Sequence, residues 1–147
     1  MIVYIAGAID LIDRATAERW RSDVKRLLEE RGVDFVDPLY APTVGHSAQD
    51  VYMRNRQSFD AADAVFAEHA FHVPHYGTTV EIEESVRRRK PTVVWVGDLR
   101  PPLYLLRHKG SRFVVASAIP EAVDALVAMV GALQGVEGGR DVAGSRD

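Results

Sequence analysis

The sequence predicts a single α/β domain, built on a parallel sheet with helices on both faces. The length of 147 residues suits one domain, since domains most often contain about 100–150 residues. Short apolar segments alternate with segments of helical periodicity, which is typical of parallel strands joined by helical crossovers. With 47% hydrophobic and 27% charged residues, the composition is that of a packed core, which excludes global disorder.

Five strands are predicted from the apolar segments. The first segment, residues 2–7, is a continuous apolar run, as expected of a strand that is buried on both faces, and Gly7 ends it. The other predicted strands are residues 33–36, 64–70, 92–97 and 112–117.

Four helices are predicted between and after these strands. In residues 14–31 apolar side chains recur at three- and four-residue spacing, and Gly32 is a typical C-terminal stop. Ser47 is the expected N-cap of the second helix, and Thr78 begins the third. Pro120 begins the last helix, because a proline in the first turn lacks only an N–H group that has no partner there.

The predicted domain spans residues 1–134, and the glycine-rich residues 135–147 are expected to be a flexible C-terminal tail. Right-handed crossovers between the strands lead to a doubly wound, flavodoxin- or Rossmann-like sheet with strand order 2-1-3-4-5. Ligands of such sheets bind at the carboxyl ends of the strands, here between the first and third strands. The loops at 7–13 and 70–81 are therefore expected to form the site.

Composition excludes several classes of partner and chemistry. The 18 basic and 21 acidic residues give a net charge of -3, so the basic excess that binds a nucleic-acid polymer or an anionic membrane is missing. The absence of cysteine excludes disulfides, thiolate nucleophiles and Cys-based zinc sites. The opening residues do not resemble a signal peptide, and no apolar run reaches the ~18–20 residues of a membrane span. A cytoplasmic protein without a membrane partner is expected.

The first loop, which begins with Gly7-Ala8-Ile9-Asp10, is the first candidate ligand contact. It lacks the second and third glycines of a dinucleotide fingerprint, and the sequence contains no P-loop, so no nucleotide cofactor is expected. Gly7 either lets a small ligand approach the strand end or forms a tight turn. Asp10 and Asp37, both at strand ends on the ligand side, are either acids of the site or ordinary turn residues.

A second candidate is the segment Gly77-Thr78-Thr79-Val80-Glu81. Thr78 followed three residues later by Glu81 has the spacing of a capping box, which needs no chemistry. In the alternative interpretation, Glu81 lies in the first turn of a helix at the carboxyl end of the third strand. There the helix dipole would keep it ionised, as a nucleophile or a base requires.

Three histidines, His69, His72 and His75, crowd the same loop near Glu81. Histidine and carboxylate ligands suit zinc, but the spacing matches no helical metal motif, so no metal is expected. His72 and His75 are instead solvated or contact the ligand, and His75 is the preferred contact. On the preceding helix, Asn55 falls on the apolar face, where a buried polar group needs a partner.

Four segments, in this order and spacing, resemble the nucleoside 2-deoxyribosyltransferase superfamily, which includes the 2'-deoxynucleoside 5'-monophosphate N-glycosidases and the CMP hydrolases. The likeness covers about residues 1–130. The segments are Tyr4-Ile5-Ala6-Gly7, Phe35-Val36-Asp37-Pro38, Ala62-Asp63-Ala64-Val65-Phe66-Ala67 and Gly77-Thr78-Thr79-Val80-Glu81-Ile82.

The resemblance implies an enzyme that cleaves the N-glycosidic bond of a (2'-deoxy)nucleoside or a nucleoside 5'-monophosphate without a cofactor. Glu81 would attack C1' of the sugar, while Tyr4 and Gly7 line the base and sugar pocket. The glycosyl-enzyme would pass the sugar to a second base in a transferase, or to water in a hydrolase. The resemblance also implies a homo-oligomer, in which the loop 98–111 with Tyr104 completes a neighbouring site.

The sequence departs from the family pattern at two positions. Asn55 stands where many members carry a helical Asp, and an amide cannot donate an acidic proton, although it can hydrogen-bond a sugar hydroxyl or the base. Glu83 stands where a Gly is common, and it is expected either to alter the packing of the helix or, through its carboxylate, to raise the pKa of Glu81.

Two alternatives to a transferase therefore stay open. The first is a nucleoside 5'-monophosphate hydrolase, for which Ser111, Arg112 and Arg14 are the candidate phosphate ligands. The second is a nucleotide-binding or sensing domain that has lost catalysis, an interpretation that Asn55 favours.

Overall fold

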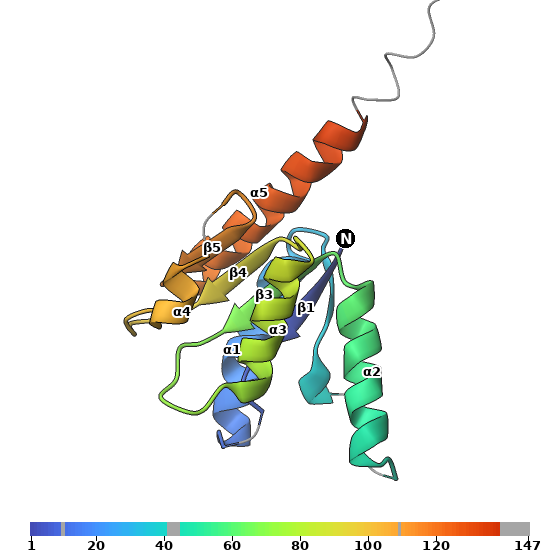
Figure 1. Cartoon of the computed structure of the whole chain (residues 1–147), viewed down its shortest axis with the longest axis vertical. Coiled ribbons are helices and arrows are strands. Elements are labelled where there is room, and N and C mark those ends of the chain that lie inside the picture. Colours follow the sequence, from blue (N-terminus) through green and yellow to red (C-terminus); the bar gives the residue numbers. More distant parts are fainter. Residues whose placement is uncertain (10, 41–44, 109, 139–147) are drawn as a thin grey trace, which may run out of the picture.

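The structure, a computed structural model, confirms the predicted sheet: five parallel strands in the order β2-β1-β3-β4-β5 (Figure 1). It describes residues 1–9, 11–40, 45–108 and 110–138. The elements in chain order are β1 (Ile2–Ala6), α1 (Arg14–Glu29), β2 (Asp34–Val36), the 3-10 helix η1 (Pro38–Tyr40), α2 (Ala48–Ala61), β3 (Ala64–Glu68), α3 (Tyr76–Arg87), β4 (Thr92–Trp95), α4 (Leu103–Leu106), β5 (Phe113–Ala116) and α5 (Ile119–Gly138).

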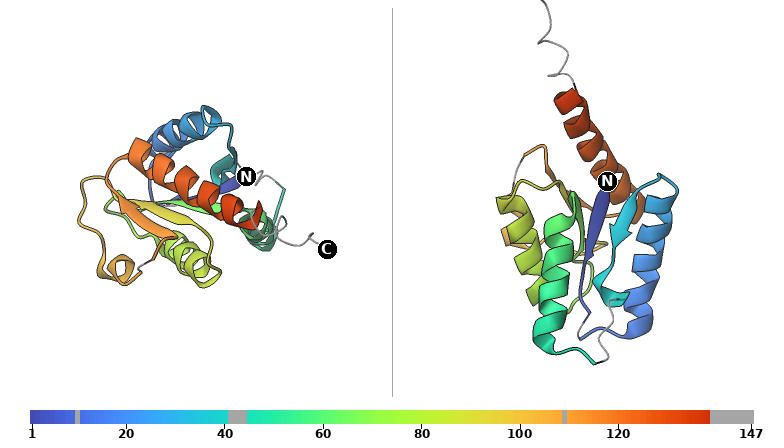
Figure 2. Two further views of the ribbon diagram at one scale, coloured as in Figure 1. Left: turned by 90° about the horizontal axis from the view of Figure 1, so that it is seen from above. Right: turned by 90° about the vertical axis from the view of Figure 1, so that its right-hand side faces the viewer.

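Helices cover both faces of the sheet. Helices α1 and α5 pack on one face, and α2, α3 and α4 pack on the other (Figure 2). Strand β1 lies between β2 and β3, with Tyr4 opposite Val36 on one side and Val65 on the other. The chain therefore reverses its winding direction at β1 and β3, which is where a doubly wound sheet opens a crevice at its carboxyl edge.

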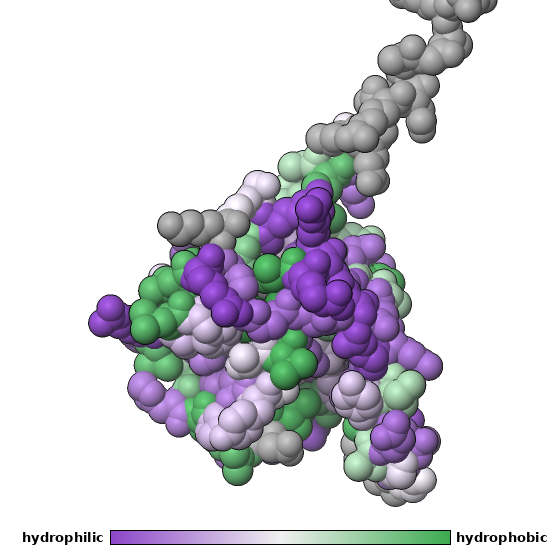
Figure 3. Space-filling view, viewed as in Figure 1, coloured by the Kyte–Doolittle hydropathy of each residue, from purple (hydrophilic) through white to green (hydrophobic). Residues whose placement is uncertain are grey.

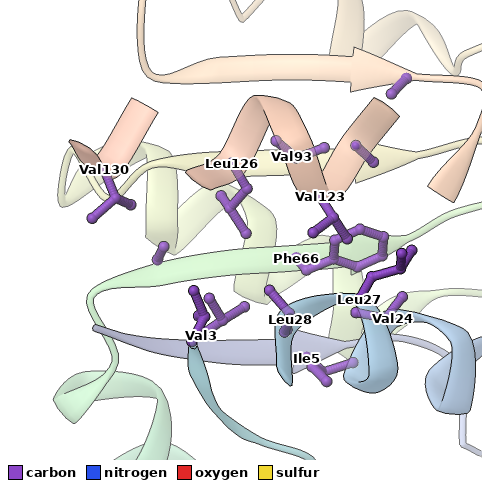
Figure 4. Close-up of a cluster of buried hydrophobic side chains, with 14 of the residues drawn as sticks. Val3, Ile5, Val24, Leu27, Leu28, Phe66, Val93, Val123, Leu126 and Val130 are labelled. Atoms are coloured by element: carbon purple, nitrogen blue, oxygen red, sulfur yellow. The ribbon is translucent and has the colours of Figure 1, made fainter. Parts of the chain in front are cut away.

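Alternation along β1 sends its side chains to two separate cores. Val3 and Ile5 point toward α1 and α5, into the cluster drawn in Figure 4. Tyr4 and Ala6 point the other way, toward α2 and α3, and pack with Phe59. Tyr4 therefore lies in the second core, and its side chain is fully buried.

The first turn of α3 differs from the prediction. The helix begins at Tyr76, two residues before the predicted start, and its N-cap His75 makes no side-chain capping bond. Thr78 is inside the helix, so the expected capping box with Glu81 is wrong. The Ser47 cap of α2 is confirmed, with a capping box completed by Asp50.

Other elements also differ from the prediction. Strand β3 ends at Glu68, so His69 belongs to the following loop. The loop 98–111 contains a short helix, α4, that was not predicted. Helix α5 continues to Gly138, past the predicted domain boundary at residue 134, and residues 139–147 of the predicted tail lie outside the described part of the chain.

The exposed surface over the C-terminal halves of α2 and α3 is strongly hydrophilic (Figure 3). Ion pairs join the two helices there: Arg56 lies 2.9 Å from Glu84, and Arg88 lies 2.7 Å from Asp60. Of the helices that the structure describes, none is long and apolar enough to cross a membrane.

Candidate active site

A cavity of about 610 Å³ opens at the carboxyl ends of β1 and β3. Its walls are the loop after β1, the inner face of α2 and the first half of α3. The N-terminal half of α2 extends beyond the strand ends and forms one side of the crevice (Figure 1). The ligand site was predicted from the sequence at this same edge of the sheet.

Most of the predicted site residues meet in this cavity. Asp37 does not line it, and Asp10 lies outside the described residues. The predicted residues that line the cavity are Tyr4, Gly7, Ile9, Asn55, His75, Gly77, Thr78 and Glu81.

Tyr4 and Glu81 form the polar centre of the cavity. The Tyr4 hydroxyl donates a hydrogen bond of 2.7 Å to Oε1 of Glu81. Tyr4 is held by the edge-on contact of its ring with Phe59 of α2, and Glu81 is fixed by the second turn of α3. Three separate elements therefore position one carboxylate against one phenol.

Burial raises the pKa of Glu81 to about 7, although the Tyr4 hydrogen bond and the positive charge of Arg21 both favour the carboxylate. Burial and the neighbouring Glu81 raise the pKa of Tyr4, so its hydroxyl remains a donor. The expectation that the helix dipole keeps Glu81 ionised is wrong. The dipole acts mainly within the first turn, and Glu81 is already in the second.

Glu83 does not act on Glu81 as predicted. Its carboxylate turns toward the end of α4, where it accepts hydrogen bonds of 2.6 Å from Arg107 and 2.9 Å from His108. Residues two apart on a helix do not face one another, which explains why the two carboxylates stay independent.

Replacing Tyr4 with Phe is expected to raise the pKa of Glu81 above 7. The variant loses a hydrogen bond to a charged group, worth about 1.5–3 kcal/mol, which corresponds to about one to two pKa units. The measurement is an NMR titration of the Glu81 side-chain carbon in both proteins. An unchanged titration midpoint would show that the hydrogen bond does not stabilise the carboxylate.

The loop after β1 rests on a buried arginine. Arg21, 0% exposed, donates to the carbonyl oxygens of Gly7 at 3.0 Å and Ala8 at 3.5 Å. Its Nε lies 3.1 Å from Asp37, which also pairs with Lys25 at 3.3 Å. Asp37 is therefore placed beneath the loop rather than in the cavity, because both of its oxygens face buried or half-buried cations.

Gly7 itself is required by a close approach. A Cβ at this position would lie 2.5 Å from Cζ2 of Trp20, inside any allowed contact distance. The tight-turn interpretation of Gly7 and the ligand-approach interpretation are compatible, since Gly7 also lines the cavity.

Glu68 does not line the cavity itself but supports two residues that do, Ala8 and His75, and the sequence analysis did not single it out. It ends β3, is 0% exposed, and accepts hydrogen bonds from the amides of Ala8 at 3.3 Å and Ala70 at 2.6 Å. Its two oxygens also lie 3.1 and 3.2 Å from Nε2 of His75. The available signal was an acidic residue at the end of an otherwise apolar strand.

The three histidines of the loop do not converge on one point. His69 stacks on His75 with ring centroids 4.3 Å apart, whereas His72 is exposed. Within the described ranges there is no group of three or more His, Cys, Asp or Glu side chains that could hold a metal ion.

The candidate phosphate ligands lie elsewhere. Ser111 and Arg112 precede β5, at the amino edge of the sheet, and Arg112 donates to the carbonyl of Arg89. Arg14 pairs with Glu18 on α1 and does not line the cavity. The arginine that does line it is Arg56, a residue that the sequence analysis missed.

The mouth of the cavity is surrounded by exposed apolar side chains. They come from the loop after β1, from α2 and from α3, and apolar side chains that gather on the surface in this way often mark a binding site. The residues and their exposed fractions are Ile9 41%, Leu11 71%, Tyr52 62%, Tyr76 79% and Val80 65%.

Comparison of the sequence with protein-family models and with curated proteins gives no match. Comparison of the structure does. A 2-deoxyribosyltransferase from Leishmania mexicana aligns with a TM-score of 0.67 at 20% identity, over 86% of this chain and 96% of that one. The chain has the fold of the nucleoside 2-deoxyribosyltransferase superfamily.

Two further solved structures are similar to this chain. The CMP N-glycosidase of Clostridium botulinum aligns with a TM-score of 0.59 at 18% identity, over 86% of this chain and 98% of that one. The 2-deoxyribosyltransferase of Bacillus psychrosaccharolyticus aligns at 0.57 and 16% identity, over 69% of this chain and 77% of that one. The deoxyribosyltransferase fold thus includes both a transferase and an N-glycosidase among the neighbours of this chain.

Proposed function

We propose that this protein cleaves the N-glycosidic bond of a (2'-deoxy)nucleoside or a nucleoside 5'-monophosphate, with Glu81 as the nucleophile. The observation that carries the proposal is the buried Tyr4–Glu81 pair, 2.7 Å apart, in the cavity at the carboxyl edge of the sheet. A carboxylate with a pKa of about 7 is available in its ionised form at neutral pH and above. The fold supports the proposal, since neighbours of this fold act on nucleosides or nucleotides.

The reaction divides into two displacements. In the first, an oxygen of Glu81 forms a bond to C1' as the C1'–N bond breaks, and the electron pair of that bond leaves with the base. In the second, water or a second base attacks C1' and releases the Glu81 carboxylate. The hydroxyl of Tyr4 stays protonated throughout and holds the attacking carboxylate in one orientation.

The cavity suits a nucleoside in size and lining. Its volume of about 610 Å³ lies within the usual range of small-molecule pockets. The exposed rings of Tyr52 and Tyr76 at its mouth offer faces on which a base can stack. Asn55, on the wall formed by α2, offers an amide to a sugar hydroxyl or to the base.

A homo-oligomer is part of this proposal. On helix α4, Leu103 is 78% exposed and Leu106 is 47% exposed. The hydroxyl oxygen of Tyr104, between them in sequence, lies 3.4 Å from the hydroxyl oxygen of Thr79 on α3. A second copy packed on α4 would bury these side chains. Sedimentation equilibrium tests this, and a pure monomer at micromolar concentration would contradict it.

The proposed activity is tested by chromatography of a nucleoside panel. Ribo- and deoxyribonucleosides and their 5'-monophosphates are incubated with the protein, with and without a second free base, and beside Glu81→Ala as control. Release of base without an acceptor indicates a hydrolase, and exchange that depends on the acceptor indicates a transferase. Nucleotide binding, seen as a thermal shift, without release from any substrate would instead support a sensing domain.

Asn55→Asp is expected to keep or raise turnover. The new carboxyl group offers an acid on the wall of the cavity, and general acids contribute about 100-fold or more where they engage the leaving group. The measurement is kcat for the best substrate of the panel, with Gln57→Glu, an exposed position on the same helix, as control. A collapse of kcat in Asn55→Asp alone would show that the amide itself is required.

A further inference from the structure

Negative side chains outnumber positive ones on the wall of the cavity. Of the described residues that line it, those of the Lys, Arg, Asp and Glu types are Arg56, Glu81 and Glu84. The side chain of His75, which also lines the wall, is 1% exposed and lies against Glu68, so a proton on its ring would be balanced by that carboxylate. When Glu81 is ionised, as the proposed nucleophile has to be, the wall carries two negative charges and one positive charge.

The positive charge of Arg56 is already neutralised. Its Nη2 donates a hydrogen bond of 2.9 Å to Glu84, and its Nε lies 3.2 Å from a carboxylate oxygen of Asp60. An arginine binds phosphate most strongly through two parallel N–H donors. Since both sides of this guanidinium face a carboxylate, a phosphate would have to compete with two anions for it.

Glu84 is a fixed part of the wall. Besides Arg56, it accepts hydrogen bonds of 2.6 Å from Arg87 and 2.6 Å from Arg88 of its own helix. The hydrogen bonds from Arg87, Arg88 and Arg56 lower the pKa of Glu84 to about 2, so the carboxylate stays ionised. Arg87 and Arg88 do not line the cavity, and Arg87 is 69% exposed, so water screens its charge from a ligand inside.

Other sources of positive charge do not reverse this balance. The amino end of α3 lines the cavity and contributes about half an elementary charge. The residues outside the description that adjoin the site elements in sequence, Asp10 and 41–44, include no basic residue. A phosphate monoester brings about 1.5 to 2 negative charges at neutral pH, whereas a nucleoside is uncharged. The charges of the wall therefore favour the nucleoside.

We propose that this protein acts on nucleosides in preference to their 5'-monophosphates, and that Glu84 determines the preference by holding Arg56 in an ion pair. The inference rests on the proposed function and narrows its substrate class. Glu84 touches neither the reacting atoms nor the nucleophile in this role; it removes the cation that a 5'-phosphate would use.

The test compares kcat/KM for three forms of one nucleoside: the nucleoside itself, its 5'-monophosphate and its neutral 5'-O-acetyl ester. The wild-type protein is expected to prefer the nucleoside to the monophosphate by about tenfold or more, because like charges repel across the cavity. The ester is expected to stay within about threefold of the nucleoside, since its 5' group carries no charge. Rejection of the ester and the monophosphate alike would show that size, and not charge, excludes the phosphate.

Glu84→Gln frees Arg56 from its partner in the cavity and is expected to reduce the preference for the nucleoside by about tenfold, mainly through a lower KM for the monophosphate. The double variant Arg56→Gln, Glu84→Gln restores the net charge of the wild-type wall and is expected to restore its preference. Glu83→Gln is the matched control, because Glu83 pairs with Arg107 and His108 away from the cavity. It is expected to leave the preference unchanged.

Thermal melting shows whether each variant is folded. A measurement on the wild-type protein alone tests the same charges: added sodium chloride is expected to narrow the preference for the nucleoside, because salt screens the repulsion between the wall and the phosphate. A preference that does not change between low and high salt would contradict an electrostatic origin.

The outcomes separate the inference from the proposed function. Equal use of both substrates by the wild-type protein, or a preference for the monophosphate, would overturn the inference while the proposed function stands. An unchanged preference in folded Glu84→Gln would overturn the role of Glu84. If the wild-type protein releases base from none of the three forms of any nucleoside in the panel, the proposed function is itself overturned, and the inference with it.

Discussion

Glu81→Gln is expected to abolish turnover and, at the same time, to stabilise the protein at alkaline pH. The loss of activity follows from removal of the nucleophile and is expected to exceed about 1,000-fold in kcat. The amide keeps an oxygen that accepts from the Tyr4 hydroxyl, so the local packing is preserved. Kinetics on the best substrate of the panel, beside the wild-type protein, provide the first measurement.

The gain in stability follows from the raised pKa. Glu81 titrates at about 7 in the folded protein, against an ordinary value of 4.5. Between these pH values the folded state binds the extra proton, so the free energy of unfolding falls as the pH rises from 4.5 to 7. Above pH 7 the full cost of the buried charge is present, about 3 kcal/mol. Glu81→Gln removes that cost.

Thermal melts at pH 4 and pH 8 test this expectation. The variant and the wild-type protein should melt together at pH 4, and the variant should melt higher at pH 8. Glu83→Gln is the matched control on the same helix, because hydrogen bonds from His108 and Arg107 lower the pKa of Glu83. Its loss should destabilise the protein at neutral pH. A lower melting temperature of Glu81→Gln at pH 8 would contradict the assignment of Glu81 as a costly buried charge.

Arg21→Met is expected to lower the free energy of unfolding by about 3–5 kcal/mol, the usual effect of breaking a buried ion pair from one side. The substitution leaves Asp37 with Lys25 as its cation and removes the donor from the carbonyls of Gly7 and Ala8. The loop after β1 loses its support, so binding of nucleoside should weaken as well.

Urea denaturation at pH 7 gives the measurement, with Lys25→Met as the matched control. Lys25 contacts the same Asp37, but its side chain is 19% exposed and reaches water, so its removal should cost less than about 1 kcal/mol. Equal losses in the two variants would show that Asp37 does not depend on Arg21 in particular.

The sequence predicted the frame of the site because the frame depends on periodicity. The alternation of strands and helices predicted a doubly wound parallel sheet, and in the predicted 2-1-3-4-5 order the ligand edge lies between β1 and β3, where Tyr4, Gly7 and Glu81 meet. The periodicity did not predict that the side chain of Glu81 is buried. Thr78 has the spacing of a cap, but the helix begins earlier, and burial rather than the dipole determines how Glu81 titrates.

The role of Asp37 could not be predicted for a similar reason. Helical periodicity does not predict that Arg21 is buried, because arginine is ordinarily expected on the exposed face of an amphipathic helix. Only the contact between α1 and the end of β2 shows that Asp37 neutralises a cation beneath the loop. Glu68 was not predicted because most of its partners are backbone amides, and every residue except proline has an amide, so no residue type marks them in the sequence.

The contact between Gly7 and Trp20 has an evolutionary consequence. Any side chain at position 7 meets the indole ring at 2.5 Å, so position 7 cannot gain even a methyl group while Trp20 is present. A smaller residue at position 20 would open that space but would leave a void under the loop and uncover Arg21, whose guanidinium lies 4.3 Å from the Trp20 ring centre. The two positions are therefore free to diverge only together, and in homologous chains a residue larger than glycine at 7 should coincide with the loss of tryptophan at 20.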